Sequence, residues 1–304
     1  MSSHLKTLTP ITEFVIIRIK ALRDAILGVI KIREEELKLL LDPYVRRADL
    51  ALMEALRNNM ENPFTGPLIE FMKGGKRIRP AILFLVNEAC GGGGSPELAA
   101  AAVELIHTAS LIHDDIIDGS DSRRGLPSFH VKHGMEMAIL IADFILSIIL
   151  EIVSEYDDKR IGKLLSEATK LMSIGEMMEA VLIKRGDPIS LDDYLEVLKY
   201  KTASLFQTAS SLGALIAGRD DLYEEMGLYG LYLGLSYQIR DDLLDWGKRG
   251  EITYLLKGSN IREFLEDLAF QFSMKAIGKL NKIPDSPQKM ILREIAAYSI
   301  ERKV

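Results

Sequence analysis

The stretch LAAAAVELIHTASLIHDDIID, residues 98–118, decides the fold class of this chain. Most of its positions are Ala, Val, Leu or Ile, so as an α-helix it would be apolar on nearly every side. Residues at i, i+4, i+7 and i+11 form one stripe along such a helix: His107, Leu111, Asp114 and Asp118. The stretch therefore predicts a buried helix that ends in carboxylates.

The same helical spacing extends outward from this stretch. Apolar residues recur every three or four positions along nearly all of the 304 residues, without a convincing alternating strand pattern. The expected helices, separated by glycine and proline breaks, are 11–40, 43–60, 65–73, 77–90, 96–118, 128–133, 135–156, 159–180, 191–217, 221–246, 260–280 and 286–302. No low-complexity linker separates two halves, so we expect one all-α domain over residues 1–304.

Composition limits the class of function. The net charge is −6, whereas a general nucleic-acid binder carries a basic excess, so we expect no nucleic-acid partner. The single cysteine, Cys90, cannot form an intrachain disulfide, and we expect a reducing, cytoplasmic location. The most apolar run, residues 137–150, is short for a membrane span and includes Asp143, so it predicts a core helix.

Two acidic helix ends point to a metal. Bare carboxylates in an apolar setting are costly unless they are paired or metal-bound, and the helix dipole opposes negative charge at a C-terminus. The string D-D-x-x-D occurs a second time in YQIRDDLLDW, residues 237–246, where one face carries Gln238, Asp241, Asp242 and Asp245. One copy alone would equally fit a solvated helix end, but two copies in matched apolar contexts favour Mg²⁺, which binds carboxylates together with substrate phosphates.

Basic residues cluster at three points of this acidic chain. KGGKRIRP, residues 73–80, leads into a helix start, a natural phosphate site, although a solvated basic face is the common alternative. Further basic or hydroxyl side chains follow the first acidic helix and lie within YKTASLF, residues 200–206: Arg123, Arg124, Lys201 and Thr202. Clustered basic side chains in an otherwise acidic protein favour a small polyanionic ligand that binds together with its own metal ions.

These strings together resemble the trans-prenyltransferase family, the isoprenyl diphosphate synthases. The matching strings fall in order between about residues 70 and 246: GGKRIRP, ELIHTASLIHDDIIDGSDSRRGLPSFH, YLEVLKYKTASLF with GALIAG, and YQIRDDLLD. The resemblance implies a single bundle of long α-helices around a deep central cavity, and a homodimer. It also implies an enzyme that joins isopentenyl diphosphate to an allylic diphosphate.

The resemblance assigns a role to each polar position. About three Mg²⁺ ions that hold the allylic diphosphate would be bound by Asp114, Asp118 and Asp241, supported directly or through water by Asp115, Asp242 and Asp245. The same diphosphate would contact Arg123 and Lys201, with Lys248 as a further candidate. Isopentenyl diphosphate would be bound by Lys76, Arg79, His107 and Arg124, and the reacting carbons would be bordered by Thr202 and Gln238. The reaction would proceed by ionisation, condensation and proton loss.

The chain departs from the family pattern at two places. The family's G-Q-x-x-D string reads GEMME here, with Glu176 for the glutamine and Glu179 for the aspartate. The segment after Asp245, WGKRGEITYLLKGSN, replaces a glycine–lysine loop that supplies a further diphosphate-binding lysine, and Lys248 and Lys257 are the candidates for that role. A weakly active or regulatory subunit on the same scaffold is therefore one alternative, and a class I terpene cyclase is another.

In the family that this chain resembles, the residues one turn before the first aspartates help to set the product length. Ala109 and Ser110 stand five and four positions before Asp114, about one helical turn or 5.4 Å down the axis. Bulky aromatic residues there would close a hydrocarbon tunnel, and these small ones leave it open. We therefore expect a linear all-trans product of geranylgeranyl length or longer, with a transient membrane contact at release. The lower end of the tunnel could be closed by Phe144, Ile145 and Ile148. Alternatively, these three side chains simply pack in the core.

Overall fold

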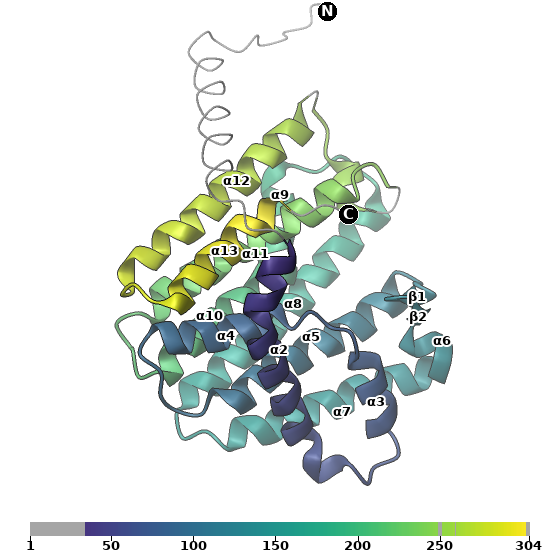
Figure 1. Cartoon of the computed structure of the whole chain (residues 1–304). Coiled ribbons are helices and arrows are strands. Elements are labelled where there is room, and N and C mark those ends of the chain that lie inside the picture. Colours follow the sequence, from purple (N-terminus) through teal and green to yellow (C-terminus); the bar gives the residue numbers. More distant parts are fainter. Residues whose placement is uncertain (1–33, 249–250, 259, 302–304) are drawn as a thin grey trace, which may run out of the picture.

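Helices make up nearly all regular structure in the computed structural model, which describes residues 34–248, 251–258 and 260–301 (Figure 1). The α-helices are α2 (Glu34–Leu56), α3 (Thr65–Met72), α4 (Ile78–Ala89), α5 (Pro96–Ile117), α6 (Phe129–His133), α7 (Met135–Ser154), α8 (Lys159–Arg185), α9 (Leu191–Leu198), α10 (Ser204–Ile216), α11 (Tyr223–Leu244), α12 (Ile261–Lys279) and α13 (Pro287–Glu301). Shorter elements are the 3₁₀ turns η1 (Arg57–Asn59), η3 (Ile252–Leu255) and η4 (Leu280–Lys282), the π-helical turn η2 (Lys199–Ala203), and strands β1 (Ser122–Arg123) and β2 (Leu126–Pro127). The all-α prediction is confirmed.

The helix α5 lies at the centre of the packing, as its sequence predicts. It contacts α2, α4, α7 and α8, while α10 packs against α4 and α11, and α12 and α13 cover α11 (Figure 1). Leu105 and Ile112 of α5 are fully buried, and burial of such a side chain stabilises the fold by about 1.5–3 kcal/mol. This packing fixes the acidic end of α5 at the same level as the acidic end of α11.

The predicted break between residues 40 and 43 is wrong. Helix α2 continues through Pro43, although proline removes a backbone donor and crowds the preceding turn. Its buried residues keep one face in phase on both sides of the proline: Leu37, Leu41, Ala48, Leu52 and Leu56. Tertiary packing of that face outweighs the local penalty of the proline. Residues 11–33 of the predicted first helix lie outside the described residues.

The predicted helix 191–217 forms as α9, η2 and α10 in unbroken succession, and the π-helical turn between them was not predicted. Glycine is required where α8 approaches this turn, because a Cβ on Gly175 would clash with the backbone of Lys201. Single π turns inside helices occur frequently at functional sites. The predicted helix 159–180 also runs further than expected, to Arg185, where Gly186 ends it with a positive φ of 69°.

A short hairpin leaves the acidic end of α5, although no strand was expected. Strands β1 and β2 pair antiparallel, with Arg123 opposite Leu126. The two turn residues, Arg124 and Gly125, have φ values of 54° and 76°. Positive φ at both central positions is the backbone pattern of a type I′ hairpin turn. The hairpin places two adjacent arginines beside the aspartates of α5.

Helix α7 contains the apolar run that was predicted as a core helix, and it is only partly buried. One face packs into the core through residues that include Ile141, Ile145 and Ile148. The other face exposes Ile139 and Leu150 among other apolar side chains. By length and composition α7 could cross a membrane, with a mean hydropathy of 2.3, but a core helix of a globular protein passes the same test.

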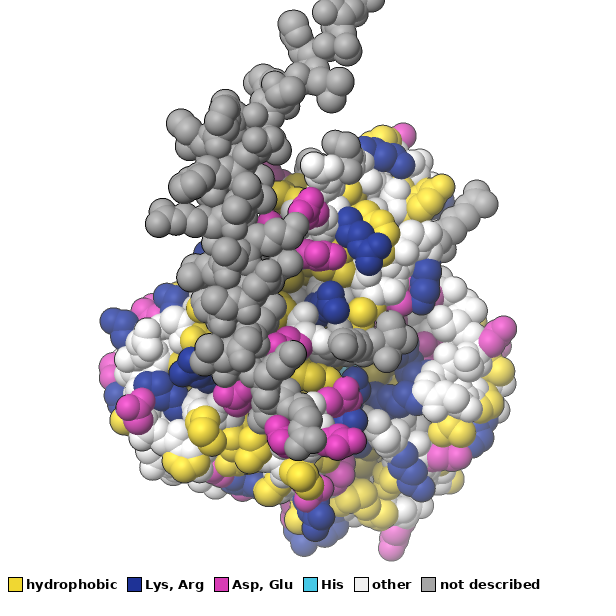
Figure 2. Space-filling view, turned by 45° about the horizontal axis from the view of Figure 1, so that its top comes forward, with side chains coloured by type: hydrophobic (Ala, Val, Ile, Leu, Met, Phe, Trp, Pro, Cys, Tyr) yellow, Lys and Arg dark blue, Asp and Glu magenta, His cyan; other side chains and the backbone are white. Residues whose placement is uncertain are grey.

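The outer surface in Figure 2 mixes charges of both signs. Lys and Arg side chains lie among Asp and Glu side chains on this face, with apolar side chains between them. No single-sign field covers the visible described residues there.

Candidate active site

A cavity of about 830 Å³ opens between α5, α7, α8, η2 and α11. Its polar end collects most of the predicted site residues, namely Arg79, His107, Asp114, Lys201, Thr202, Gln238 and Asp241, together with Glu176. Its remaining wall is largely apolar and includes Ile106, Ala109, Ala142, Leu146, Ile149 and Met172. The volume lies near the upper end of ordinary small-molecule pockets, about 300–1,000 Å³. The cavity suits a molecule with a charged head and a long apolar tail.

Asp114 is the α5 carboxylate that faces this cavity. Burial raises its pKa to about 7, because the attraction of Lys201 only partly offsets desolvation and Glu176 adds a like charge. A carboxylate whose ionised form is this poorly stabilised by protein alone gains strongly from a cation. The environment of Asp114 therefore favours binding of a metal ion.

The facing wall comes from α11, where Asp241 lines the cavity and Asp242 lies behind it. Asp242 accepts hydrogen bonds from Tyr194 Oη at 2.6 Å and from Gln238 Nε2 at 2.7 Å. Thr202 Oγ1 donates to Gln238 Oε1 at 3.0 Å. Asp242 thus orients Gln238, which in turn meets Thr202 at the cavity wall.

Lys201 projects from the π turn and is held by two glutamates of α8. Its Nζ lies 2.6 Å from Glu176 Oε2 and 2.5 Å from Glu179 Oε2. Burial alone lowers the pKa of Lys201, but the attraction of Glu179, Asp114 and Glu176 outweighs it, so that the pKa is raised and the ammonium stays charged. The two positions that depart from the family string are therefore in direct contact with a predicted substrate-binding residue.

Arg79 and His107 form the basic wall of the cavity. Arg79 stacks over the Phe206 ring at 4.6 Å, and its Nε is buried without an acceptor among the described residues. Burial lowers the pKa of His107 well below its usual range, and the positive charges of Arg79 and Arg124 add to this effect. His107 is therefore neutral at physiological pH and can donate a hydrogen bond to an anion.

A buried ion pair behind this wall was missed from the sequence. Arg77 Nη1 lies 2.7 Å from Glu104 Oε1, and Arg77 Nε lies 2.9 Å from Asp49 Oδ1. Arg77 also has a positive φ of 51°, at the residue before α4 begins. The only sequence signal was a charged residue in the apolar run of α5, at Glu104. The pair fixes the start of α4, and with it the position of Arg79.

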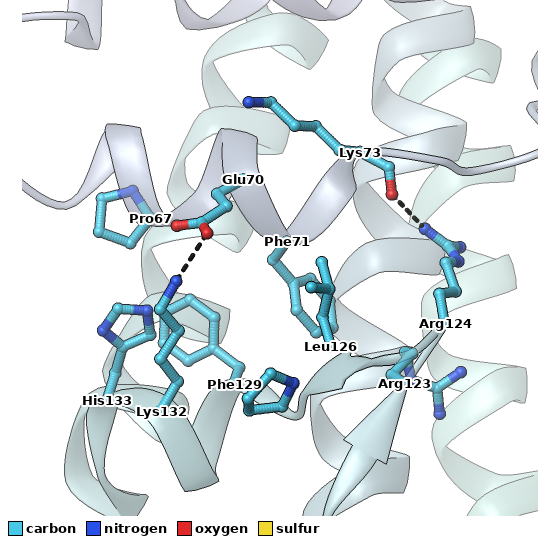
Figure 3. Close-up of a pocket in the computed structure, with 11 residues that line it drawn as sticks. Pro67, Glu70, Phe71, Lys73, Arg123, Arg124, Leu126, Phe129, Lys132 and His133 are labelled. Atoms are coloured by element: carbon cyan, nitrogen blue, oxygen red, sulfur yellow. Dashed lines mark hydrogen bonds and ion pairs between the residues drawn. The ribbon is translucent and has the colours of Figure 1, made fainter.

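The hairpin arginines lie outside the main cavity. Arg123 forms a bidentate pair with the fully buried Asp115, with Nη2 at 2.6 Å from Oδ1. Both arginines line a smaller surface pocket between α3, the hairpin and α6 (Figure 3). There Arg124 Nη1 donates to the Lys73 carbonyl at 3.2 Å, and Lys132 pairs with Glu70. Asp115 therefore anchors the hairpin and does not line the cavity.

Five further predicted residues lie at the rim and not among the residues that line the cavity. Asp118 and Asp245 are the C-cap residues of α5 and α11, and Asp118 is exposed. Lys76 is exposed before α4. Lys248 is exposed and pairs with Asp245, and Lys257 stacks on Tyr254 at 5.3 Å. The segment after Asp245 thus presents its lysines at the surface in this ligand-free arrangement.

A model of the polyprenyl synthetase family matches residues 62–255, more than half of the chain. The chain belongs to the polyprenyl synthetase family. It is 31% identical over 281 residues to the geranylgeranyl diphosphate synthase of Methanosarcina mazei, covering 76% of this chain and 86% of that one. It is 32% identical over 246 residues to the octaprenyl diphosphate synthase of Haemophilus influenzae, covering 79% and 74%. The protein is therefore a trans-prenyltransferase, a polyprenyl diphosphate synthase.

A solved structure confirms the fold of this polyprenyl diphosphate synthase. The polyprenyl synthase of Caulobacter crescentus, crystallised with calcium and isoprenyl diphosphate, superposes with a TM-score of 0.75. It is 27% identical to this chain, and the match covers 87% of this chain and 98% of that one. The predicted bundle of long helices around a deep cavity is the fold of this family.

The acidic residues of the synthase fit Mg²⁺ in the manner that this ion prefers. Within residues 34–248, 251–258 and 260–301, no three acidic, His or Cys side chains already converge into a closed ligand set. Asp114 and Asp241 nevertheless face the same cavity from opposite helices. Mg²⁺ keeps several waters and is bound by one or two carboxylates plus substrate phosphates, so an open, all-oxygen site is what it requires.

Ala109 and Ser110 both line the cavity, on the α5 face below Asp114. The cavity wall from α7 is formed by Ile139, Ala142, Asp143, Leu146 and Ile149. Ile145 and Ile148 are instead buried in the core, so core packing, the alternative considered for them, is confirmed. The face of α7 that lines the cavity is therefore a different one from the face that carries Ile145 and Ile148.

Proposed function

We propose that this synthase extends an allylic diphosphate with isopentenyl diphosphate to a linear all-trans product of geranylgeranyl length or longer. The observation that carries the proposal is the single cavity with Asp114 and Asp241 at its polar end. Small side chains at Ala109 and Ser110 leave room below them, and the wall beyond is apolar. An amphipathic diphosphate with a long hydrocarbon chain fits this division of polarity.

The acidic end binds the allylic diphosphate in this proposal. Asp114, Asp118 and Asp241 are assigned to about three Mg²⁺ ions, and the rim position of Asp245 suits a supporting ligand. When bound, the ions neutralise the charge that develops on the departing diphosphate. Lys201 and Arg123 are assigned to the same diphosphate, and both are currently paired with carboxylates. Asp115 supports the site by holding Arg123.

The basic wall binds isopentenyl diphosphate. Arg79 offers an unpaired buried Nε, and neutral His107 offers a ring N–H. Lys76 and Arg124 are assigned to its outer oxygens from the rim. Thr202 and Gln238 border the reacting carbons, where their mutual hydrogen bond keeps both side chains in place. The double bond then attacks the allylic carbon, and the proton lost afterward passes to an oxygen of the released diphosphate.

The apolar wall protects the reaction and holds the growing chain. A carbocation that forms within a cavity closed to water reacts with the neighbouring double bond and not with solvent. The apolar side chains of α5, α7 and α8 line the route that extends away from the aspartates. The product therefore lengthens into this route until its walls stop it.

The exposed face of α7 supports two further proposals. Outside the residues that line the cavity, it carries the large exposed apolar side chains Met135, Leu140 and Leu150. A patch of this kind marks an interface, and we place the contact of a homodimer there. Release of an apolar product implies a transient contact with a membrane near the same opening. The single buried thiol, Cys90, is consistent with the cytoplasm as the compartment.

An elongation assay tests the proposal. The protein is incubated with Mg²⁺, labelled isopentenyl diphosphate and allylic primers of increasing length, and the products are separated by chromatography. We expect a product of geranylgeranyl length or longer from at least one primer. Absence of elongation with every primer would overturn the assignment and favour a regulatory subunit.

A substitution then tests the length. Ala109→Phe places a ring below Asp114 and should shorten the product, since it narrows the tunnel about one turn down the helix. Leu50→Phe places the same ring on the exposed surface of α2, outside the cavity, and should leave the product unchanged. An unchanged product from Ala109→Phe would contradict the open-tunnel proposal.

A further inference from the structure

Two carboxylates compete with substrate for Lys201 at the polar end of the cavity. Glu176 and Glu179 lie one turn apart on α8, and both contact the Lys201 ammonium. All three side chains are largely buried, so their attraction is weakly screened by solvent. The Lys201 ammonium thus already has two carboxylate partners, and a diphosphate would have to compete with them.

The backbone holds the same lysine from its other end. Gly175 brings α8 directly against the backbone of Lys201, at a point where any Cβ would clash. The π turn fixes where the side chain of Lys201 begins, and the two glutamates fix where it ends. Lys201 is therefore held at both ends, at its backbone by α8 and at its ammonium by the two glutamates.

Glu176 also acts on the opposite wall. It lines the cavity with Asp114 and raises the pKa of that residue as a like charge, in addition to the larger effect of burial. With Asp241 facing them, the carboxylates repel an anion that carries no metal. A diphosphate neutralised by metal ions would not meet this repulsion.

We infer that Glu176 and Glu179 are positioning residues that hold Lys201 on α8 and exclude diphosphate that carries no metal. The inference rests on the proposed function, because it takes a diphosphate as the ligand of this cavity. A diphosphate neutralised by metal ions is not repelled by the acidic wall. Its oxygens can then replace the two glutamates as the partners of the Lys201 ammonium. Metal-free diphosphate must overcome both the ion pair and the like charges.

Calorimetric binding of inorganic pyrophosphate to the full chain tests this inference, in EDTA and in Mg²⁺. In EDTA, Glu176→Gln should bind pyrophosphate roughly tenfold more tightly than the parent, since removal of one nearby like charge is an effect of this size. Glu176→Asp should restore the weak binding. Glu167→Gln removes an exposed carboxylate of α8 outside the cavity and should resemble the parent.

A double substitution separates release of Lys201 from simple loss of repulsion. Relative to Lys201→Gln alone, the added Glu176→Gln should give a smaller gain in EDTA, because only the loss of repulsion remains once the ammonium is absent. A gain of the same size without Lys201, or equal binding by parent and Glu176→Gln, would overturn the inference alone. Failure of the folded parent to bind pyrophosphate even with Mg²⁺ would instead overturn the proposed function and the inference together. Circular dichroism of each variant confirms that it is folded.

Discussion

The acidic ends of α5 and α11 have the same D-D-x-x-D motif, but their middle aspartates are buried against different kinds of partner. Asp115 is paired with the guanidinium of Arg123, which comes from the hairpin that follows α5. Asp242 accepts hydrogen bonds from two neutral groups, Tyr194 and Gln238. One string therefore uses its second aspartate to anchor a loop by charge, and the other uses it to orient a side chain.

The difference shows that a repeated motif does not imply repeated roles at every position. The first and last aspartates of each string face the cavity or its rim, where an ion can be shared between the two helices. The middle aspartates are buried in the protein, and each one pairs with the groups that surround it. Separate substitutions at outer and middle positions therefore test whether the two kinds of position have different roles.

The largest effect is expected at the cavity-facing aspartates. Asp114→Asn and Asp241→Asn should each lower kcat by roughly 10²–10³-fold, because each removes a group that stabilises charge on the leaving diphosphate. Thermal stability of Asp114→Asn without metal should not fall, since burial disfavours the ionised form of Asp114 and raises its pKa to about 7. Steady-state elongation assays with saturating substrates measure the effect. A large loss at one position alone would contradict equivalent roles for the outer aspartates.

The pH dependence of stability should distinguish Asp242 next. Burial raises its pKa to about 7 from 3.8, despite the hydrogen bonds from Tyr194 and Gln238, which lower it. The protonated form thus contributes stability that is present below about pH 4 and lost as the pH rises through 7. Each pKa unit is worth about 1.4 kcal/mol, and relaxation of the buried site reduces the total, so we expect about 2 kcal/mol.

Urea unfolding in EDTA at pH 4.5 and pH 8 measures this change for the parent and for Asp242→Asn. The variant has no proton to lose, so the stability advantage of the parent should shrink from the lower to the higher pH. A constant difference between the two proteins would show that Asp242 keeps its usual pKa, and that neutral partners suffice to hold it ionised.

Asp115→Asn tests the ionic anchor of the other string. The change should destabilise the protein by about 1–3 kcal/mol, because it weakens a bidentate contact with Arg123 at a fully buried site. It should also speed tryptic cleavage after Arg123 and Arg124, as the hairpin loosens. Asp158→Asn disrupts the more exposed pair with Arg160 and should change the free energy of unfolding by less than about 1 kcal/mol. Equal effects from both variants would remove the special role of Asp115.

Tyr194→Phe should give the smallest effect, about 1 kcal/mol, through loss of one buried hydrogen bond to Asp242. Tyr200→Phe is its matched control, because Tyr200 Oη donates to Glu196 at the exposed surface. Urea unfolding at pH 7 compares the two variants. A similar small cost for both would mean that the Tyr194 contact does not support the α11 string.

The sequence predicted best those site residues whose positions follow from the periodicity of a helix. Asp114, Asp241 and Gln238 were expected on helix faces, and they line one cavity because buried helices pack with those faces inward. The partners that depend on distant packing could not be predicted in this way. Asp49 of α2 reaches Arg77 only because α2 packs across α4 and α5.

Local departures from regular helix geometry likewise could not be predicted from the sequence. The π turn at Lys201 depends on the close approach of Gly175 from α8, and helix propensity contains no such information. The hairpin was missed because its strands have two residues each, too few to show alternation. The prediction of one domain over residues 1–304 includes residues outside the described ranges and stays a prediction.

In the proposed mechanism, Asp114 and Asp241 hold one metal–diphosphate group between them. A crystal structure with pyrophosphate and Mn²⁺, whose anomalous signal locates each ion, tests this directly. We expect Mn²⁺ ions between the two helix ends, bridged by pyrophosphate within the cavity. Mn²⁺ bound at only one helix end, or pyrophosphate bound outside the cavity, would contradict it.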